Sequence, residues 1–206
     1  MGDIRAIETY YKGYRFRSRL EARWAVFFDL VGIEFEYEPE GLILRDGTKY
    51  LPDFYLPQFY CYFEVKRKGI EEDKAIEAIA KISDGHYTGK WAGIICFGDP
   101  YDHDMRVYCQ ESDDGGGGPY TAKVVFARSV ITQKPILFSW NDTRARSFYP
   151  SWEESERKII PMETDVDMHT VFYASNPYIT EDIIFAELAA RQARFEYGET
   201  PIPVRR

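Results

Sequence analysis

The sequence predicts a mixed α/β fold: a helix, a β-meander, a crossover helix and a further strand, followed by a β-rich extension and a carboxy-terminal helix. Three patterns predict this fold. Residues 18–31 have apolar side chains at helical spacing, and residues 42–65 have strand-like segments between turn residues. Residues 71–97 have a helical segment followed by an apolar run. We expect a core over residues 1–100 and an extension over residues 101–206 that packs on it as one compact unit.

The first helix is predicted to run from Ser18 to Val31, because Leu20, Trp24, Phe27 and Phe28 form one apolar stripe with Val31 and Gly32 follows as a stop. Glu21 borders that stripe, and two roles are open for it. It fits a capping box with Ser18, in which the glutamate returns to the first amide of the helix. It also fits a carboxylate that reaches inward to a metal or a lysine, and the two roles are compatible.

Two strands are predicted around Asp46-Gly47, a dipeptide that favours a type I′ hairpin. The second strand runs over residues 48–54 and contains Pro52, which has no N–H for a ladder hydrogen bond. We therefore expect an edge strand or a strand that ends near Pro52. Either arrangement leaves Asp53 free to turn toward a ligand.

The next strand is predicted over residues 60–65, where aromatic and β-branched side chains alternate. Successive side chains of a strand point to opposite faces, so Glu64 and Lys66 share one face while Phe63 and Val65 face the core. The alternative is a solvated strand face with a weak Glu64–Lys66 ion pair.

Two carboxylates and one ammonium group on neighbouring strands are the groups that metal-assisted phosphodiester cleavage requires. Magnesium prefers oxygen ligands, usually one or two carboxylates with water and the phosphate of the substrate. A lysine beside the cation can orient or deprotonate the attacking water. Asp53, Glu64 and Lys66 are therefore candidate catalytic residues, with Glu21 as the third carboxylate.

In this order, Glu21, Pro52-Asp53 and Glu64-Val65-Lys66 resemble the motif of the PD-(D/E)XK nuclease superfamily, whose fold is restriction-endonuclease-like. The resemblance covers residues 14–98. The proteins that the chain resembles are restriction endonucleases, archaeal Holliday-junction resolvases, transposon end-cleaving nucleases and small phage-encoded members of the superfamily. The RecB-like branch has a glutamine on the helix after the E-x-K strand, but residues 70–83 contain none, which favours an endonuclease over a processive exonuclease.

The resemblance implies a magnesium-dependent DNA endonuclease in which manganese substitutes for magnesium. Asp53, Glu64 and the backbone carbonyl of Val65 correspond to the metal ligands, and Lys66 to the residue that positions the water. Glu21 binds a second cation or fixes the other ligands. A different hypothesis is a catalytically inactive module on the same fold that binds nucleic acid or a protein partner. Cleavage of RNA is a third.

The net charge of −8 argues against a general nucleic-acid coat, because phosphate neutralisation provides most non-specific affinity. Basic side chains nevertheless cluster beside the candidate site, with Arg23 inside the first helix. Those predicted to contact DNA are Lys12, Arg15, Arg17, Arg19, Arg67 and Lys68. The alternative is an ordinary charged surface.

In the second half, strands are predicted over 106–110, 120–127 and 135–140, and irregular structure over 141–178. Residues 113–119 contain four glycines and form either a mobile hairpin tip or a tolerant surface loop. The last helix is predicted to run from Thr180 to Gly198 and to pack on the core or on a second copy in a homodimer. Its basic side chains, with those of the terminus, are candidates for nucleic-acid contact: Arg191, Arg194, Arg205 and Arg206.

Composition argues against several other classes. Cys61, Cys96 and Cys109 have no disulfide or zinc spacing and are expected to be buried thiols, which suits a reducing compartment. No segment is long and apolar enough to span a membrane, and no signal peptide or lipidation motif is present. We expect a cytoplasmic protein, in the host cytoplasm if it is phage-encoded, that uses no nucleotide cofactor.

Overall fold

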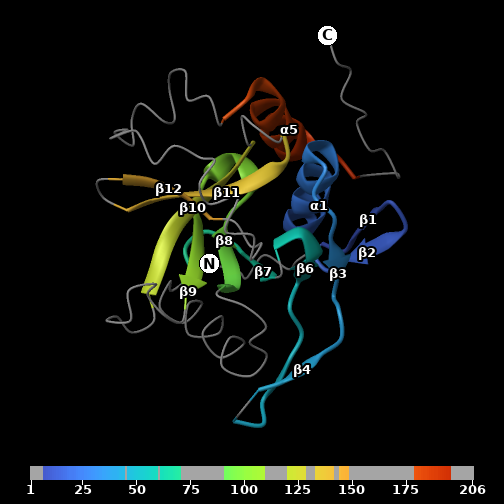
Figure 1. Cartoon of the computed structure of the whole chain (residues 1–206). Helices are drawn as coiled ribbons and strands as arrows, with labels where there is room; N and C mark the ends of the chain where they lie inside the picture. The colour runs from blue at the N-terminus through green and yellow to red at the C-terminus, as the bar shows by residue number, and fades with distance from the viewer. Residues whose placement is uncertain are drawn as a thin grey trace.

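A computed structural model describes residues 7–44, 46–59, 61–70, 91–109, 120–128, 133–141, 144–148 and 179–195. In these ranges the fold is mixed α/β, as predicted, and it has two α-helices and a mostly antiparallel central sheet (Figure 1). The sheet has the order β12-β11-β10-β9-β8-β7-β6-β3. Its strands are β3 (Glu36–Tyr37), β6 (Phe54–Leu56), β7 (Cys61–Lys66), β8 (Trp91–Phe97), β9 (Met105–Cys109), β10 (Tyr120–Arg128), β11 (Pro135–Asn141) and β12 (Arg144–Phe148).

Helix α1 (Arg19–Val31) begins and ends where the sequence predicted. The N-cap is Ser18, whose hydroxyl accepts a hydrogen bond from the Glu21 N–H at 3.2 Å. Gly32 ends the helix with a left-handed φ of 77°, a conformation that glycine adopts without strain. A short hairpin precedes the helix, β1 (Thr9–Tyr11) with β2 (Tyr14–Phe16), which the sequence analysis did not predict.

The helices α1 and α5 (Glu181–Gln192) lie side by side on one face of the sheet (Figure 1). Aromatic rings fill the space beneath α1. Phe28 is fully buried and contacts Phe54, Phe63 and Phe126, all with ring centroids within 6 Å of its own. This core fixes α1 against the strands that carry the candidate catalytic residues.

Strands β7 and β8 pair in parallel, with Glu64 opposite Ile95 and Lys66 opposite Phe97. The parallel pair agrees with the predicted crossover unit, although the predicted helix over 71–83 lies outside the described residues. Beyond β8, the sheet continues through antiparallel strands from β9 to β12. One sheet therefore connects the predicted core with the predicted extension.

The predicted hairpin around Asp46-Gly47 forms an arm of two strands, β4 (Leu42–Ile43) and β5 (Lys49–Tyr50), that is not hydrogen-bonded into the central sheet (Figure 1). The type I′ prediction is wrong, because that turn has two residues between the paired strand ends, whereas the Leu44 N–H donates to the Thr48 carbonyl at 2.9 Å and leaves three residues between them. Gly47 alone has a left-handed φ, of 81°, and its N–H donates to the Leu44 carbonyl at 2.9 Å. Chain pairing resumes only at Phe54, so the strand predicted over 48–54 is interrupted at Pro52 and Asp53.

Three further predictions about the second half can be compared with the structure. Residues 144–148 form β12, so irregular structure across 141–178 is wrong there; the strand forms because it pairs with β11 at the sheet edge. Helix α5 ends at Gln192 and not near Gly198, since Ala193 leaves the helical conformation. Gly198, Arg205 and Arg206 lie outside the described residues, as does the glycine-rich segment 113–119.

Cys61 and Cys96 are buried free thiols, as predicted, and burial raises the pKa of both. The side chain of Cys109 lies outside the described part of the chain. Among the described helices, none has the length and apolar character needed to cross a membrane.

Candidate active site

The side chains of Glu64 and Lys66 lie on the same face of β7, as the strand periodicity predicted. Phe63 and Val65 point to the other face and join the core beneath α1. Glu64 is only 4% exposed, and its carboxylate forms an ion pair with the Lys66 ammonium group. The alternative of a solvated strand face is therefore wrong for Glu64, since its partner strand β8 and the arm exclude water from it.

Asp53 lies directly before β6 and meets Glu64 across the gap between β6 and β7. Its Oδ2 accepts a hydrogen bond from the Val65 N–H at 2.8 Å, and its own N–H donates to Glu64 Oε2 at 3.3 Å. Asp53 is 4% exposed. The two candidate metal ligands are thus buried neighbours: the Asp53 N–H positions the carboxylate of Glu64, and the Val65 N–H positions that of Asp53.

The backbone carbonyl of Val65 is oriented toward the same group. The N–H and C=O of a residue in a strand point to the same side, and the Val65 N–H points to Asp53. The hydrogen-bonded ladder between β6 and β7 ends with the pair Phe54 and Phe63. Val65 therefore lies beyond the ladder, and β6 does not pair with its carbonyl. Two carboxylates and one carbonyl therefore converge at the start of β6.

The electrostatics of this group favour a cation. Burial and the negative charge of Glu64 raise the pKa of Asp53 to about 7, although the Val65 N–H and the Lys66 ammonium group lower it. Two carboxylates buried side by side are unfavourable unless positive charge compensates them. Their oxygen atoms, with that of Val65, are the hard ligands that magnesium and manganese prefer.

Arg17 is part of this site, whereas the sequence analysis predicted only a contact with DNA. Its Nη2 lies 2.7 Å from Asp53 Oδ1, and its Nε lies 2.5 Å from a carboxylate oxygen of Glu38. Burial lowers the pKa of Arg17, but a hydrogen bond with Tyr37 and the charges of Asp53 and Glu38 raise it overall. No local pattern indicates this contact, because Arg17 and Asp53 are far apart in the sequence.

Glu21 takes part in the N-cap of α1 and also lies next to the candidate active site. Its carboxylate accepts hydrogen bonds from the Ser18 hydroxyl at 2.7 Å, the Arg17 N–H at 3.1 Å and the Tyr37 hydroxyl at 2.6 Å. The backbone donor is Arg17 and not the N-cap residue, so the predicted capping box is shifted by one residue. Both oxygens of Glu21 have donors here, which suits a residue that positions Arg17 beside Asp53. Coordination of a cation by Glu21 stays a prediction.

Tyr50 is a site residue that the sequence analysis missed. Burial, followed by the charge of Glu64 and a hydrogen bond to it, raises the pKa of Tyr50. The arm brings Tyr50 there because Leu42, Leu44 and Tyr50 pack against Ile95 and Phe97 on the sheet face opposite α1. Only this folding of the arm over β8 indicates the contact, and the local sequence has no signal for it.

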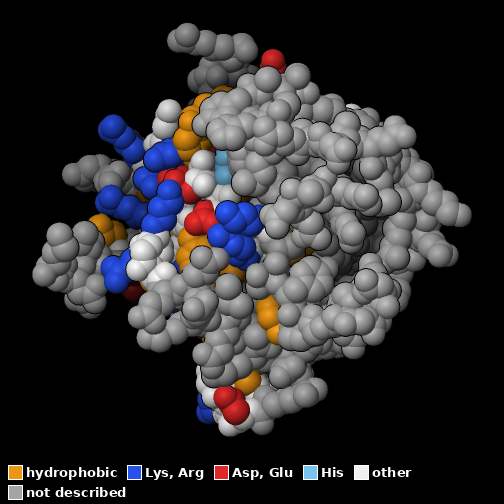
Figure 2. All heavy atoms as spheres, turned by 90° about the vertical axis from the view of Figure 1, so that its left-hand side faces the viewer, with side chains coloured by type: hydrophobic (Ala, Val, Ile, Leu, Met, Phe, Trp, Pro, Cys, Tyr) orange, Lys and Arg blue, Asp and Glu red, His pale blue; other side chains and the backbone are white. Residues whose placement is uncertain are grey.

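The structure separates the basic residues that were predicted to contact DNA. Lys12 pairs with Asp29 at 2.9 Å, Arg15 with Glu8 at 2.5 Å and Lys68 with Asp102 at 2.7 Å. Arg19 lines a pocket between the helices, and Arg67 follows β7. Figure 2 shows Lys and Arg side chains gathered around a few acidic ones on one face of the molecule. Contact of these residues with DNA stays a prediction.

Among the described residues, no group of three or more His, Cys, Asp or Glu side chains is arranged to hold a metal ion. The candidate site is a smaller donor set, with two carboxylates from Asp53 and Glu64 and one backbone oxygen from Val65. Such a set leaves coordination positions for water and for a phosphate oxygen, as is usual for magnesium.

The chain was compared with models of known protein families and with curated protein sequences. No family model matches it, and no curated protein matches it.

Proposed function

We propose that the protein is a metal-dependent endonuclease that hydrolyses DNA phosphodiester bonds, on a restriction-endonuclease-like core. The observation that carries this proposal is the convergence of Asp53, Glu64 and Lys66 at one end of β6 and β7. The choice of DNA and of internal cleavage comes from the resemblance of the motif to the PD-(D/E)XK nucleases.

Each residue has a chemical role in this proposal. Asp53, Glu64 and the Val65 carbonyl would hold magnesium or manganese, and a cation bound there would supply charge neutralisation of the scissile phosphate and a more acidic water. Lys66 is held next to the carboxylates by its ion pair with Glu64, where its N–H groups orient the water for in-line attack. Glu21 keeps Arg17 in place, and Tyr50 donates to Glu64 from the arm.

One observation favours a second function, a nuclease-fold module that binds nucleic acid or a protein partner without cutting. Arg17 contacts Asp53 and Lys66 contacts Glu64, so each buried carboxylate already has one positive neighbour, although Arg17 also pairs with Glu38. A site with these ion pairs can persist without a divalent cation. Hydrolysis and binding therefore have to be measured separately.

The deciding experiment incubates the protein with supercoiled, linear and branched DNA and with RNA, in magnesium, manganese or a chelator. We expect metal-dependent cleavage of DNA that is lost in Asp53→Asn and in Glu64→Gln. Glu34→Gln is a matched control, because it removes the charge of an exposed carboxylate away from the site.

Cleavage that persists in both site variants would refute the proposed site. Tight binding without cleavage of any substrate would support the binding module instead. Preferential cleavage of RNA would keep the site and change the substrate.

A further inference from the structure

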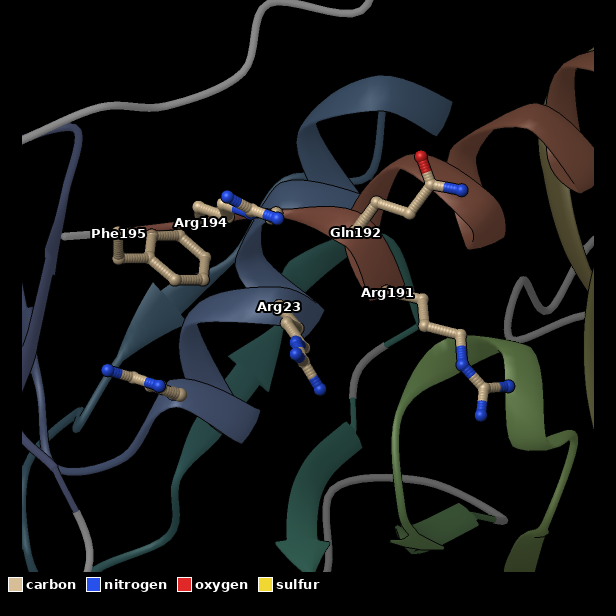
Figure 3. A pocket seen from close by; sticks show the side chains of 7 residues that line it. Arg23, Arg191, Gln192, Arg194 and Phe195 are labelled. Carbon is tan, nitrogen blue, oxygen red and sulfur yellow. The ribbon is translucent and has the colours of Figure 1, made fainter.

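A pocket of about 570 Å³ lies between α1 and α5. Four of its lining residues are arginines, Arg19 and Arg23 from α1 and Arg191 and Arg194 from α5 and the residues after it. Figure 3 shows Arg23 projecting from α1 and Arg191 projecting from α5 toward the green segment that follows β8. The pocket joins the basic residues predicted separately near the two ends of the chain.

Packing of the two helices and of the turn after β8 builds this pocket. Ile183, Ala186 and Ala190 bury one side of α5 in the core beside α1. The turn contains the short helix η2 (Pro100–Asp102), and the Trp24 Nε1–H of α1 donates to the Gly98 carbonyl at 3.0 Å. The positions of the arginines are therefore determined by the folded core.

Two acidic side chains beside the pocket, Asp99 and Asp102, form long contacts with two of its arginines. Arg23 Nη1 and Arg191 Nε lie 3.6 and 3.8 Å from Asp99 Oδ2, and Arg191 Nη1 lies 3.9 Å from Asp102 Oδ1. These distances exceed those of hydrogen bonds. Asp102 Oδ1 is also 2.7 Å from the Lys68 ammonium group. Arg23 and Arg191 thus share Asp99 at long distance, and the second carboxylate near Arg191, that of Asp102, has a closer partner.

The guanidinium groups are oriented while donors remain for a ligand. Arg191 stacks over Tyr101, with its central carbon 4.7 Å from the ring centroid, which leaves the edge of the guanidinium plane for hydrogen bonds. Buried Nε of Arg23 has no hydrogen-bond partner among the described residues. A buried donor without a partner is unfavourable.

We infer that this arginine pocket binds a phosphate group of the nucleic-acid backbone. Guanidinium groups match phosphate oxygens in paired hydrogen bonds, and several together suit a polyanion. The pocket and the acidic site lie at the same end of β7 and β8, where the Gly98 N–H donates to the Lys66 carbonyl at 2.8 Å. A nucleic-acid strand that crosses this end of the sheet would place one phosphate at Asp53 and Glu64 and another in the pocket. The identity of the polyanion rests on the proposed function.

The test measures binding of a fluorescent DNA duplex in a chelator, so that cleavage plays no part in the readout. The variants are Arg23→Gln and Arg191→Gln, and the control is Lys123→Gln, which removes one positive charge from an exposed position on β10. We expect each pocket variant to raise Kd about tenfold and to lower the salt slope by about one, and the control to change neither by as much. Circular dichroism and Tm confirm that each variant is folded.

Pocket variants that bind DNA like the control would overturn the inference, whether or not the protein cuts DNA. Loss of binding in the pocket variants supports it even if cleavage is never found, so its failure is distinct from that of the proposed function. A second experiment uses inorganic phosphate as the ligand. If phosphate raises the Tm of the wild type but the pocket variants keep full DNA affinity, the pocket is a site for free phosphate and the inference is wrong.

Discussion

The acidic site and the arginine pocket both combine acidic and basic side chains, but they differ in which charge is buried. Asp53 and Glu64 are each 4% exposed, and Arg17 and Lys66 contact them at the margin. In the pocket, the side chains of Arg23 and Arg191 are 32% and 46% exposed, and they stay more than 3.5 Å from Asp99 and Asp102.

This difference indicates ligands of opposite sign. Buried carboxylates next to each other favour additional positive charge, while open guanidinium groups with long contacts retain donors for an anion. The two regions lie at one end of the same parallel strand pair, so one phosphodiester chain can use both.

Lys66→Ala should remove the group that orients the water and lower the cleavage rate by about 10²–10⁴-fold. Lys68→Ala is the matched control two residues away, because Lys68 pairs with Asp102 beside the pocket. Single-turnover cleavage at saturating DNA measures both. Equal losses in the two lysine variants would remove the distinction between the regions.

Phe28→Ala should weaken both regions together, because the buried ring of Phe28 holds α1 against β6 and β7. Truncation of a fully buried phenylalanine lowers the free energy of unfolding by about 3–5 kcal/mol. Urea denaturation measures the loss. An unchanged midpoint would show that α1 does not depend on this core.

The acidic site should bind its cation more tightly as the pH rises, because the pKa of Asp53 is raised to about 7 and only the carboxylate is a ligand. Below pH 7, magnesium affinity should fall by up to about tenfold per pH unit. Without the cation the sign reverses: from about pH 4 to 7 the folded state keeps a proton that the unfolded chain releases, so stability falls as pH rises.

Thermal denaturation at pH 5.5 and 8, with and without magnesium, measures both effects. Asp53→Asn is the control, since it cannot titrate and should lose this pH dependence. A magnesium-induced rise in Tm that is the same at both pH values would contradict the raised pKa.

Glu21→Gln and Ser18→Ala separate positioning from capping. Glu21→Gln weakens the acceptor for Arg17 and Tyr37, so we expect about 10–100-fold slower cleavage. Ser18→Ala removes the cap and should lower stability by about 1 kcal/mol with little change in rate. Equal rates in the two variants would assign Glu21 to the cap alone.

Local patterns predicted α1, the E-x-K strand and a strand end near Pro52 and Asp53. Each depends on neighbours in the sequence: the Ser18 cap and Gly32 stop for the helix, alternation for β7, and the missing N–H of Pro52 for the break before β6. The turn at Asp46-Gly47 was predicted with the wrong type, because its backbone conformation depends on how the two strands pair. The strand at 144–148 was not predicted, because it forms by pairing with β11.

By itself, the sequence determined which residues bear the proposed chemistry and which of them share a face, because side-chain periodicity in helices and strands is local. Only the tertiary structure decided that Arg17 compensates Asp53, that the arm brings Tyr50 to Glu64, and that Arg23 meets Arg191 in one pocket. Those contacts join residues far apart in the chain. Packing of the helices and the arm on opposite faces of the sheet brings them together.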